Sequence, residues 1–387
     1  MFDSITTKAT CYALTITAVI LLTGCRQKPV AKLPATAPVV ATSVANPALG
    51  GATGGALKIG FVYGGSIGDA GSTYAHDLAR KALEAQFGDK IKTTFVENVA
   101  DAATGERVLR DLAAQGNGLI FATSAMFQEP MLKVAKDFPA VKFEDAGGAM
   151  LAANVGVYDA RSYEGAYLSG VIAAAMSKSG KLGVVASTPT PDVFRDINAF
   201  VLGAQSSNPK ISTRVAWVNK SFDPTKEREA ALGLLQQGAD VLLQTTDSPA
   251  PLQAAEEKGM RAFGWNADMS KFGPKAQLAS ATINWAPYYT KVVSDLLAGN
   301  WKSENVLTGS KEEAVVMTSL NPDLPPELKT SFDEKSAAIK AGTLQPFQGP
   351  IIDQSGKKIL APGAAMEDKD LRTMNFYVKG VEGALPK

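Results

Sequence analysis

The sequence predicts an α/β protein built from two lobes with parallel sheets. Three observations carry this prediction: a length of 387 residues, an alternation of short β-rich runs with amphipathic stretches from Leu57 onward, and a restart of that alternation near the middle. A chain of this length commonly forms two domains. Strands that alternate with helices form parallel sheets covered by helices, and ligands bind beyond the carboxyl ends of such strands. We therefore expect a ligand cleft between two α/β halves.

In the first half, short runs rich in β-branched and aromatic residues predict strands, and the stretches between them have the apolar spacing of helices. Helices are expected at about 73–87, in "GERVLRDLAAQG", whose last glycine suits a helix C-cap, and in "EPMLKVAKDFP". The expected strands are "LKIGFVYG", "KTTFVENV", "GLIFATS" and "AVKFEDAGG".

The second half repeats this rhythm after the helix-like "RSYEGAYLSGVIAAAMSKSG". Asp223 followed by Pro224 is a favourable helix start, because Asp caps the helix and Pro suits its first position. The expected strands are "KLGVVAS", "RVAWVN", "ADVLLQTT", "MRAFGWN" and "QLASATINW", and helices separate the first four: "DVFRDINAFVLGAQ", "DPTKEREAALGLLQQG" and "APLQAAEEKG". A helix over about 287–298, the strand "EEAVVMTSL", the helix "PPELKTSFDEKSAAIKAG" and a turn-rich tail from Leu344 follow.

Composition excludes several classes of function. The 39 basic residues nearly balance the 38 acidic ones, so the chain has no broad basic field for nucleic acid. One histidine and two cysteines are too few for most zinc sites, iron–sulfur clusters and disulfide scaffolds. We expect no cofactor, no metal and no nucleic-acid partner.

Residues 1–25 are similar to a bacterial lipoprotein signal. Lys8 precedes an apolar run over 9–22, which is shorter than the roughly 20 residues of a membrane-spanning helix but suits the core of a signal peptide. The run ends in "LTGC", which resembles a lipobox, whose cysteine, here Cys25, is lipidated and becomes the new N-terminus. An ordinary secretory signal is the alternative. Cleavage before Cys25 would also remove Cys11, and we expect a lipid-anchored protein of the cell envelope that faces the periplasm or the exterior.

Residues 26–56 are rich in Pro, Ala and Gly and contain no aromatic residue. This composition is typical of a disordered linker. Such a chain has an end-to-end distance of about 30 Å. We therefore predict a tether between the lipid anchor and the folded body.

A glycine-rich turn follows the first expected strand. The segment from Gly64 to Gly68 fits the G-x-S-x-G pattern of a nucleophilic serine, here Ser66. The only histidine, His76, lies in the next helix, so nothing later in the chain can serve as the base of a catalytic triad. Glycines after a strand also let the backbone approach a ligand, and the N–H groups of the next helix can bind it. The turn is therefore predicted to grip a ligand.

Ordered blocks along the whole body carry a resemblance to a known family. They are "KIGFVYGGSIGDAGSTYAHDLARKALEAQFGDKIKTTFVENV", "KFEDAGG", "YDARSYEGAYLSGVIAA", "WVNKSFDPTKE", "DVLLQTTDS", "FGWNADM", "INWAPYY" and "MNFYVKGV". Together they resemble the basic membrane protein (BMP) family, substrate-binding lipoproteins of ABC transporters related to purine nucleoside receptors. The resemblance implies a type I periplasmic-binding-protein fold, in which two Rossmann-like lobes joined by crossing strands close on a small ligand. We expect lobe 1 at 57–165 and 285–318, and lobe 2 at 166–284 and 319–387.

Known relatives in this family bind purine nucleosides or bases, so the resemblance implies a purine ligand. A purine has two faces for stacking and a rim of donors and acceptors, which aromatic rings, carboxylates and amides bind well. Asp247 in "TTDS" is our candidate for two ribose hydroxyls. The ligand-binding candidates, which lie at or near predicted strand ends, are Asp69, Tyr74, His76, Thr123, Phe127, Asp145, Asp247, Trp265, Asn266 and Trp285, with Asp77 and Asp268 as polar neighbours.

Structural roles stay open for several of these candidates. Trp265 directly follows a strand, so packing in the core competes with stacking on a ligand. Trp285 begins a predicted crossing between the lobes and is expected in the cleft. Asp69 could instead cap the following turn, and His76 could serve only to donate one hydrogen bond.

Three neighbouring residues are expected to have structural roles. Asp77 lies inside a helix and should face solvent, and Tyr288 and Tyr289 should pack against their lobe. Relatives often carry an aromatic residue close after the Gly-Asp of the first turn, where this chain has Ala70 and Ser72. This departure weakens the transfer of the family's stacking residue to this chain, and the identity of the base stays open.

The sequence thus predicts a non-enzymatic, lipid-anchored receptor that binds a purine base or nucleoside and delivers it to an ABC permease in the membrane. The first alternative is a protein of the same fold that binds another solute, such as a sugar or an amino acid, or that acts as a sensory receptor. The second is a nucleoside-cleaving enzyme that uses a cleft aspartate as base, although the sequence shows no obvious metal cluster or acid–base pair.

Overall fold

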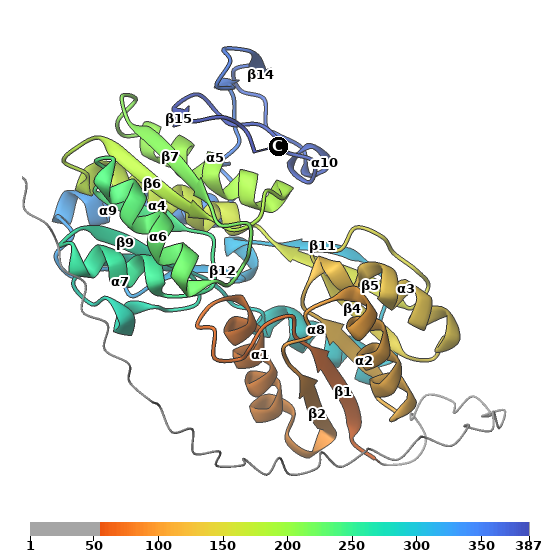
Figure 1. Ribbon diagram of the computed structural model, residues 1–387. Coiled ribbons are helices and arrows are strands. Elements are labelled where there is room, and N and C mark those ends of the chain that lie inside the picture. Colours follow the sequence, from red (N-terminus) through yellow and green to blue (C-terminus); the bar gives the residue numbers. More distant parts are fainter. Residues whose placement is uncertain (1–54, 387) are drawn as a thin grey trace, which may run out of the picture. The chain divides into compact units, whose positions relative to one another are not determined.

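The structure of the protein, a computed structural model, describes residues 55–386 (Figure 1). The predicted signal segment, Cys25 and nearly all of the predicted tether lie outside the described residues. No helix in the described range is both long enough and apolar enough to cross a membrane.

The first sheet has six strands, and each neighbouring pair runs parallel. Its strands alternate their side chains, so Ile59 and Phe61 pack under one pair of helices while Val62 packs under the other. Helices α1 (Ser72–Phe87) and α8 (Ala286–Leu297) cover the first face, and α2 (Ala102–Ala114) and α3 (Gln128–Asp137) cover the second. The strand order is β11 (Asn305–Thr308), β5 (Val155–Ala160), β4 (Lys142–Ala146), β3 (Leu119–Ala122), β1 (Leu57–Val62), β2 (Ile91–Val96). This sheet and its four helices form lobe 1.

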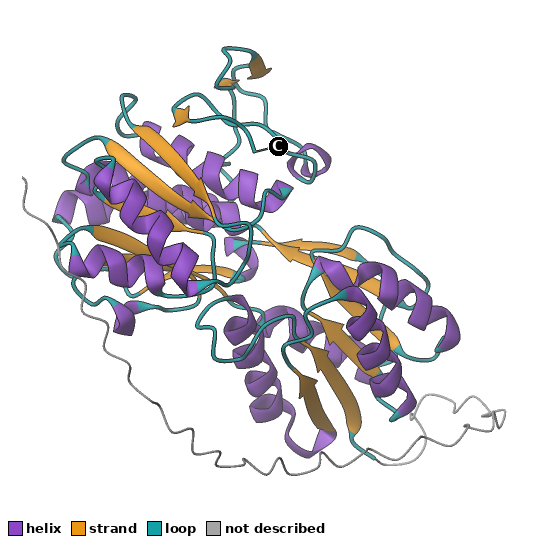
Figure 2. Ribbon diagram, in the orientation of Figure 1, coloured by secondary structure: helices purple, strands orange, loops and turns teal. Residues whose placement is uncertain are grey.

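The second sheet has seven strands and is parallel except for β12, which runs antiparallel to β10. Its order is β12 (Val315–Thr318), β10 (Gln277–Ile283), β9 (Arg261–Asn266), β8 (Val241–Gln244), β6 (Lys181–Ala186), β7 (Ser212–Trp217), β15 (Val381–Glu382). Helices α4 (Ser162–Met176), α5 (Pro191–Gln205) and α9 (Pro326–Lys340) pack on one face, and α6 (Pro224–Gln236) and α7 (Ala250–Glu257) on the other. These elements belong to lobe 2, and Figure 2 shows strands between helices in both lobes.

Local sequence explains how individual helices begin and pack. The Asp223 side chain accepts a hydrogen bond from the Lys226 N–H and Pro224 is the first helical residue, which confirms the predicted start of α6. Helix α4 is apolar all round because it is buried all round. It approaches α5 through Gly170 and Gly203, where any Cβ atom would collide with the backbone of the facing helix.

The chain passes between the sheets after β5, after β10 and after β11. Because β12 pairs with β10, residues 315–318 belong to lobe 2, and the boundary that we expected at 318 is too late. Helix α4 packs along α5, so lobe 2 begins at Ser162 rather than at 166. Strands β5 and β11, which pair with one another, were not predicted as strands: β5 contains Gly156, and β11 is a short, half-exposed edge strand.

The tail is turn-rich, as predicted, and contains β13 (Ile351–Ile352), β14 (Lys358–Leu360) and α10 (Asp368–Leu371). It is nevertheless anchored to lobe 2, because β15 extends the sheet beside β7 and Tyr377 is buried. The Trp217 Nε1–H donates to the Tyr377 hydroxyl at 2.9 Å. Short 3₁₀ turns complete the described elements: η1 (Gly88–Lys90), η2 (Ala125–Phe127), η3 (Ser270–Phe272) and η4 (Ser310–Glu312).

Candidate functional site

The turn between β1 and α1 presents backbone amides at the carboxyl edge of the first sheet. The Asp69 carboxylate accepts hydrogen bonds from the N–H groups of Gly71, Thr73 and Tyr74 at 2.8, 3.1 and 3.1 Å. Asp69 therefore caps α1, which was the structural alternative for this residue. Ser66 does not stand at a helix start: its hydroxyl donates to the Glu97 carboxylate at 3.1 Å. This geometry lacks the strand-to-helix elbow of a serine hydrolase.

A carboxylate of lobe 2 reaches the start of the same helix. The Ser72 N–H donates to Asp247 Oδ1 at 2.7 Å, and Asn266 Nδ2 donates to the same oxygen at 3.1 Å. Asn266 has φ 63°, a left-handed conformation that Asn adopts more readily than most residues. Burial and the nearby charge of Asp69 raise the pKa of Asp247 to about 7. The structure thus brings Asp69, Asp247 and Asn266 together across the lobes.

Buried hydrogen bonds fix the loop that carries Asp247. The Asp247 N–H donates to the Ser221 carbonyl oxygen at 2.8 Å. Glu227 of α6, which is fully buried, accepts from the Asp223 N–H at 2.8 Å and from the Ser248 N–H and hydroxyl at 3.2 and 2.5 Å. Burial raises the pKa of Glu227. This carboxyl joins the loops after β7 and β8, and no local sequence pattern pointed to it.

Two of the predicted ligand-binding residues lie in a cluster of rings inside lobe 1. His76 stacks on Trp285 with 4.8 Å between ring centroids and 7° between planes, and His76 Nδ1 lies 2.6 Å from the Tyr289 hydroxyl. The Tyr289 hydroxyl also bonds the Tyr158 hydroxyl at 2.9 Å. Burial lowers the pKa of His76 to about 3, so the imidazole is neutral. Trp285 is only 7 % exposed and packs in this cluster, and its place in the cleft stays a prediction.

The remaining aromatic candidates divide between core and surface. Phe127 and Trp265 are buried in the hydrophobic cores of lobes 1 and 2, so their rings serve packing. Tyr74 is half-buried, its ring belongs to neither core, and its backbone is beside Asp69. Phe222, which sequence reasoning missed, is 48 % exposed and directly follows Ser221, the residue that accepts from Asp247. The exposure of this large aromatic side chain, next in sequence to a residue that bonds the Asp247 backbone, is a signal that only the structure provides.

Asp145 lies near the end of β4 in lobe 1 and is fully buried. Gln128 Nε2 donates to its Oδ2 at 3.2 Å, whereas its Oδ1 has no hydrogen-bond partner within the described residues. Burial raises the pKa of Asp145 to about 8, which keeps it a neutral acid at pH 7. Gly148 covers this carboxyl so closely that a Cβ atom there would collide with it. Thr123, at the end of the neighbouring β3, donates to the Val62 carbonyl oxygen at 3.3 Å.

Two polar neighbours of the predicted site have structural roles. Asp77 is fully buried, and the expectation that it faces solvent is wrong. Burial disfavours its charged form, but the hydrogen bonds and charges of Arg80, at 2.7 Å, and Lys81 outweigh this and lower the pKa of Asp77. Asp268 is exposed and accepts from the Ser319 hydroxyl at 2.5 Å and the Ser270 N–H at 2.9 Å. Tyr288 and Tyr289 pack inside lobe 1, as predicted.

The comparisons with known proteins agree with this architecture. Residues 56–345 match the Bmp family model, described as ABC transporter substrate-binding protein, PnrA-like. The chain belongs to this family. It is 48% identical over 351 residues to a purine-binding protein of Brucella abortus, covering 90% of this chain and 100% of the relative. It is 34% identical to a putative ABC transporter glucose-binding protein of Haloferax volcanii, covering 87% and 83%.

Solved structures show the same fold for this Bmp-family chain. An ABC transporter solute-binding protein from Conexibacter woesei aligns with a TM-score of 0.62 and 26% identity, over 75% of this chain and 98% of the other. The predicted type I periplasmic-binding-protein fold is thereby confirmed. The chain is a substrate-binding protein of an ABC transporter, and such proteins act outside the cytoplasm.

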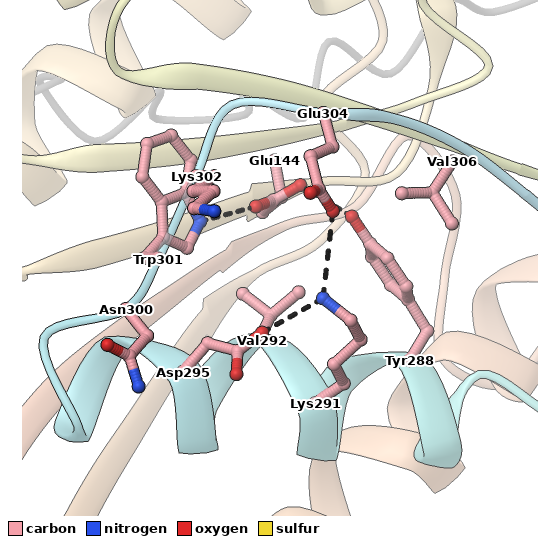
Figure 3. Close-up of a pocket in the computed structure, with 10 residues that line it drawn as sticks. All are labelled: Glu144, Tyr288, Lys291, Val292, Asp295, Asn300, Trp301, Lys302, Glu304 and Val306. Carbon is pink, nitrogen blue, oxygen red and sulfur yellow. Dashed lines mark hydrogen bonds and ion pairs between the residues drawn. The ribbon is translucent and has the colours of Figure 1, made fainter.

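Two cavities of this Bmp protein lie apart from the residues around Asp247. The first, of 350 Å³, lies between α8 and the start of β11 (Figure 3). There the Tyr288 hydroxyl and Trp301 Nε1 donate to the two oxygens of buried Glu144 at 2.8 and 2.7 Å, and burial raises the pKa of Glu144 to about 7. The second, of 590 Å³, lies between the crossing near Arg161 and the tail. Neither cavity contains a predicted ligand-binding residue.

The described part of the chain has no group of three or more metal-ligating side chains.

Proposed function

We propose that this protein binds a purine base or nucleoside between its lobes and delivers it to the permease of an ABC transporter. The observation that carries the proposal is the pair Asp247 and Asn266, which faces the first turn of α1 across the lobes. Carboxylates and amides match the donors and acceptors on the rim of a purine. The name of the Brucella relative supports the same ligand class.

Two rings that belong to neither core supply the stacking surface in this proposal. Tyr74 comes from lobe 1 and donates its own N–H to the Asp69 carboxylate. Phe222 comes from lobe 2 and follows Ser221, whose carbonyl oxygen accepts from the Asp247 backbone N–H. Aromatic rings hold a flat heterocycle by offset stacking. Asp145, a neutral acid at pH 7, can donate a hydrogen bond at the edge of lobe 1. Binding would favour the closed arrangement of the lobes, which is the form that docks on a permease.

The proposal includes binding without turnover. His76, the only histidine of the chain, is stacked on Trp285 and kept neutral by burial, so it does not serve as an acid or base for a bound nucleoside.

The proposal also includes a lipid anchor at Cys25 and a tether over 26–56, because the sequence there is similar to a lipobox followed by a linker. Mass spectrometry of the mature N-terminus tests the anchor directly.

The test of the ligand class uses the full chain, purified in detergent from cells grown without added ligand. We would denature it and analyse the released small molecules by ultraviolet absorbance and mass spectrometry, then titrate the refolded protein with purines. We expect a near-stoichiometric purine and saturable rebinding with no chemical change. Failure of every purine in the titration panel would refute the proposal.

A sugar is the second candidate ligand, because the Haloferax relative carries the name of a putative glucose-binding protein. Glucose therefore belongs in the same titration panel. Saturable binding of glucose without binding of any purine would establish this alternative and would leave the assignment to the Bmp family unchanged.

A further inference from the structure

We infer that the C-terminal tail forms a strap across the hinge, which holds the two lobes in the arrangement where they touch at Asp247. The hinge is the set of three crossings after β5, β10 and β11. The inference goes beyond the proposed function, because it concerns the protein without its ligand. It is carried by hydrogen bonds that a segment rooted in lobe 2 makes to the crossing after β5 and to lobe 1.

The tail is rooted in lobe 2. The match to the family model ends at residue 345, where the tail begins. The side-chain amide of Asn198, which is fully buried in α5, donates to the Phe376 carbonyl oxygen at 2.8 Å and accepts from the Val378 N–H at 2.9 Å. Leu371 and Met374 pack in the core of the same lobe. These contacts fix the position of α10 relative to lobe 2.

From this root, α10 reaches the crossing after β5 and the edge of lobe 1. The Asp368 carboxylate, at the start of α10, accepts two hydrogen bonds from the Arg161 guanidinium, each at 2.9 Å. Arg161 is the residue between β5 and α4, where the chain passes from lobe 1 to lobe 2. Directly after α10, Arg372 Nη2 donates to Asn305 Oδ1 at 2.7 Å. Asn305 is the first residue of β11, so this bond joins the tail of lobe 2 to the sheet of lobe 1.

These contacts lie at different distances from the hinge. Arg161 is at a crossing, and the ion pair of Asp159 with Arg195 of α5, at 3.0 Å, is beside it, so a rotation of the lobes moves these groups little. Asn305 lies three residues before Thr308, the end of β11, which places it about 10 Å from the crossing that follows. On a lever of that length, a rotation of about 20° about an axis perpendicular to β11 displaces Asn305 by about 3 Å, which is more than a hydrogen bond tolerates.

The strap and the contact at Asp247 therefore belong to one arrangement of the lobes. The Ser72 N–H of lobe 1 donates to Asp247 Oδ1 of lobe 2 at 2.7 Å in the structure in which Arg372 bonds Asn305. A hinge rotation that parts the lobes at Asp247 breaks both bonds, since each joins lobe 1 to lobe 2. A bond that must break for the lobes to separate favours the arrangement in which they touch. The tail thus biases the hinge from a position outside the ligand site.

Hydrogen exchange of the full chain in detergent, unfolded and refolded to remove bound ligand, tests the inference at single-amide resolution. The Ser72 amide reports the contact between the lobes, because its acceptor belongs to lobe 2. In Arg372→Ala we expect Ser72 exchange to rise by about threefold, the effect of losing one partly exposed hydrogen bond of a charged group. The reference amides, which donate to a carboxylate of their own lobe and should keep their rates, are Gly71, Thr73 and Tyr74.

A second variant and a matched control separate the strap from other effects of the tail. Asn305→Ala removes the other partner of the same bond, so it should have the same effect, and the double variant should exchange no faster than either single variant. The control is Arg214→Ala, which removes an exposed arginine that bonds the tail at Glu382, at 2.7 Å. Both of these partners move with lobe 2, so Ser72 exchange should stay unchanged.

Each outcome supports or overturns the inference. An unchanged Ser72 rate in Arg372→Ala and Asn305→Ala overturns it, as does an equal rise in Arg214→Ala or a rise shared by the reference amides. A Ser72 amide that exchanges in the wild type at the rate of an unstructured peptide also overturns it, since the lobes are then not held together. Should Arg372→Ala fail to fold, Asn305→Ala, at an exposed position of lobe 1, decides alone. None of these results depends on the identity of the ligand, so the proposed function stands or falls separately.

Discussion

The two lobes each bury a carboxyl near the carboxyl end of a strand, Asp145 in lobe 1 and Asp247 in lobe 2, but they use it differently. Asp247 Oδ1 accepts two hydrogen bonds, one of them from the other lobe, whereas Asp145 Oδ1 accepts none within the described residues. Burial raises both pKa values, to about 7 and about 8. The comparison shows that burial sets the proton affinity of such a group, while the donors around it decide its role.

The lobes also support this edge by different means. Lobe 1 uses packed rings, with Trp285 against His76 and Tyr158. Lobe 2 uses a buried hydrogen-bonding carboxyl, Glu227, which holds the Asp247 loop through Ser248. Packing loses stability when volume is removed, and a polar network loses it when a partner is left unsatisfied. Substitutions can therefore test the two supports separately.

The largest expected effect is on the packed support of lobe 1. Trp285→Ala should lower the free energy of unfolding by about 3–5 kcal/mol, the usual cost of removing a large buried aromatic side chain. Urea denaturation followed by circular dichroism measures it, with Trp285→Phe as the control that keeps much of the packing. A loss under about 1 kcal/mol, together with lost purine binding, would instead place Trp285 in the cleft.

The next effect concerns the polar support of lobe 2. Glu227→Ala should lower the free energy of unfolding by about 2–3 kcal/mol, because the Ser248 and Asp223 donors lose a charged or strongly polar acceptor. It should also weaken purine binding, since the Asp247 loop loses its support. Glu227→Gln keeps one acceptor and should restore part of both losses in denaturation and calorimetry. Unchanged binding in Glu227→Ala would show that the loop holds its position without Glu227.

The sequence predicted some of these features and missed others, and the reason is how far apart in the chain the interacting residues lie. Strands, helices and the capped start of α6 follow from periodicity and from local residues such as Asp223, which act within one turn. The contact between Glu227 and Ser248 joins separate loops, so no local pattern reveals it. A residue just after a strand, such as Trp285, turns into the helix layer or into the cleft according to the packing of both lobes. The capping role of Asp69 was easier to anticipate, because the N–H groups that donate to its carboxylate lie within five residues of it.

A third effect is the pH dependence that the Asp145 carboxyl gives to the free energy of unfolding. The pKa of Asp145 is raised to about 8 from its ordinary value of 3.8, so the stability that it contributes is present below pH 4 and is lost as the pH rises through 8. The folded state holds the proton in this window and the unfolded state does not. Asp145→Asn removes this dependence, so the difference in unfolding free energy between variant and wild type should shift in favour of the variant by up to about 1.4 kcal/mol per pH unit between pH 5 and 8.

Denaturation of both proteins at pH 5, 6, 7 and 8 measures that shift. The difference between them removes the background of groups such as Asp247, whose pKa is also raised to about 7. It contains the electrostatic interaction of Asp145 with its neighbour Glu144, because the charge of Glu144 adds to the rise in the pKa of Asp145. A difference that stays constant across this range would mean that the Asp145 carboxyl is already ionised at pH 5. In that case solvent reaches it, and Asp145 does not contrast with Asp247 in the way the structure indicates.

The smallest expected effect is in NMR, where the imidazole resonances of the folded protein should not change with pH. His76 is the only histidine, so proton–nitrogen NMR of the folded protein contains a single imidazole, and burial lowers its pKa to about 3. The resonances should stay constant from pH 8 to 5, whereas those of the urea-unfolded chain should titrate near 6.5. The stability that neutral His76 contributes is present above pH 6.5 and is lost as the pH falls toward 3. A midpoint near 6.5 in the folded protein would mean that water reaches the rings of lobe 1, and the contrast between a packed and a hydrogen-bonded lobe would fail.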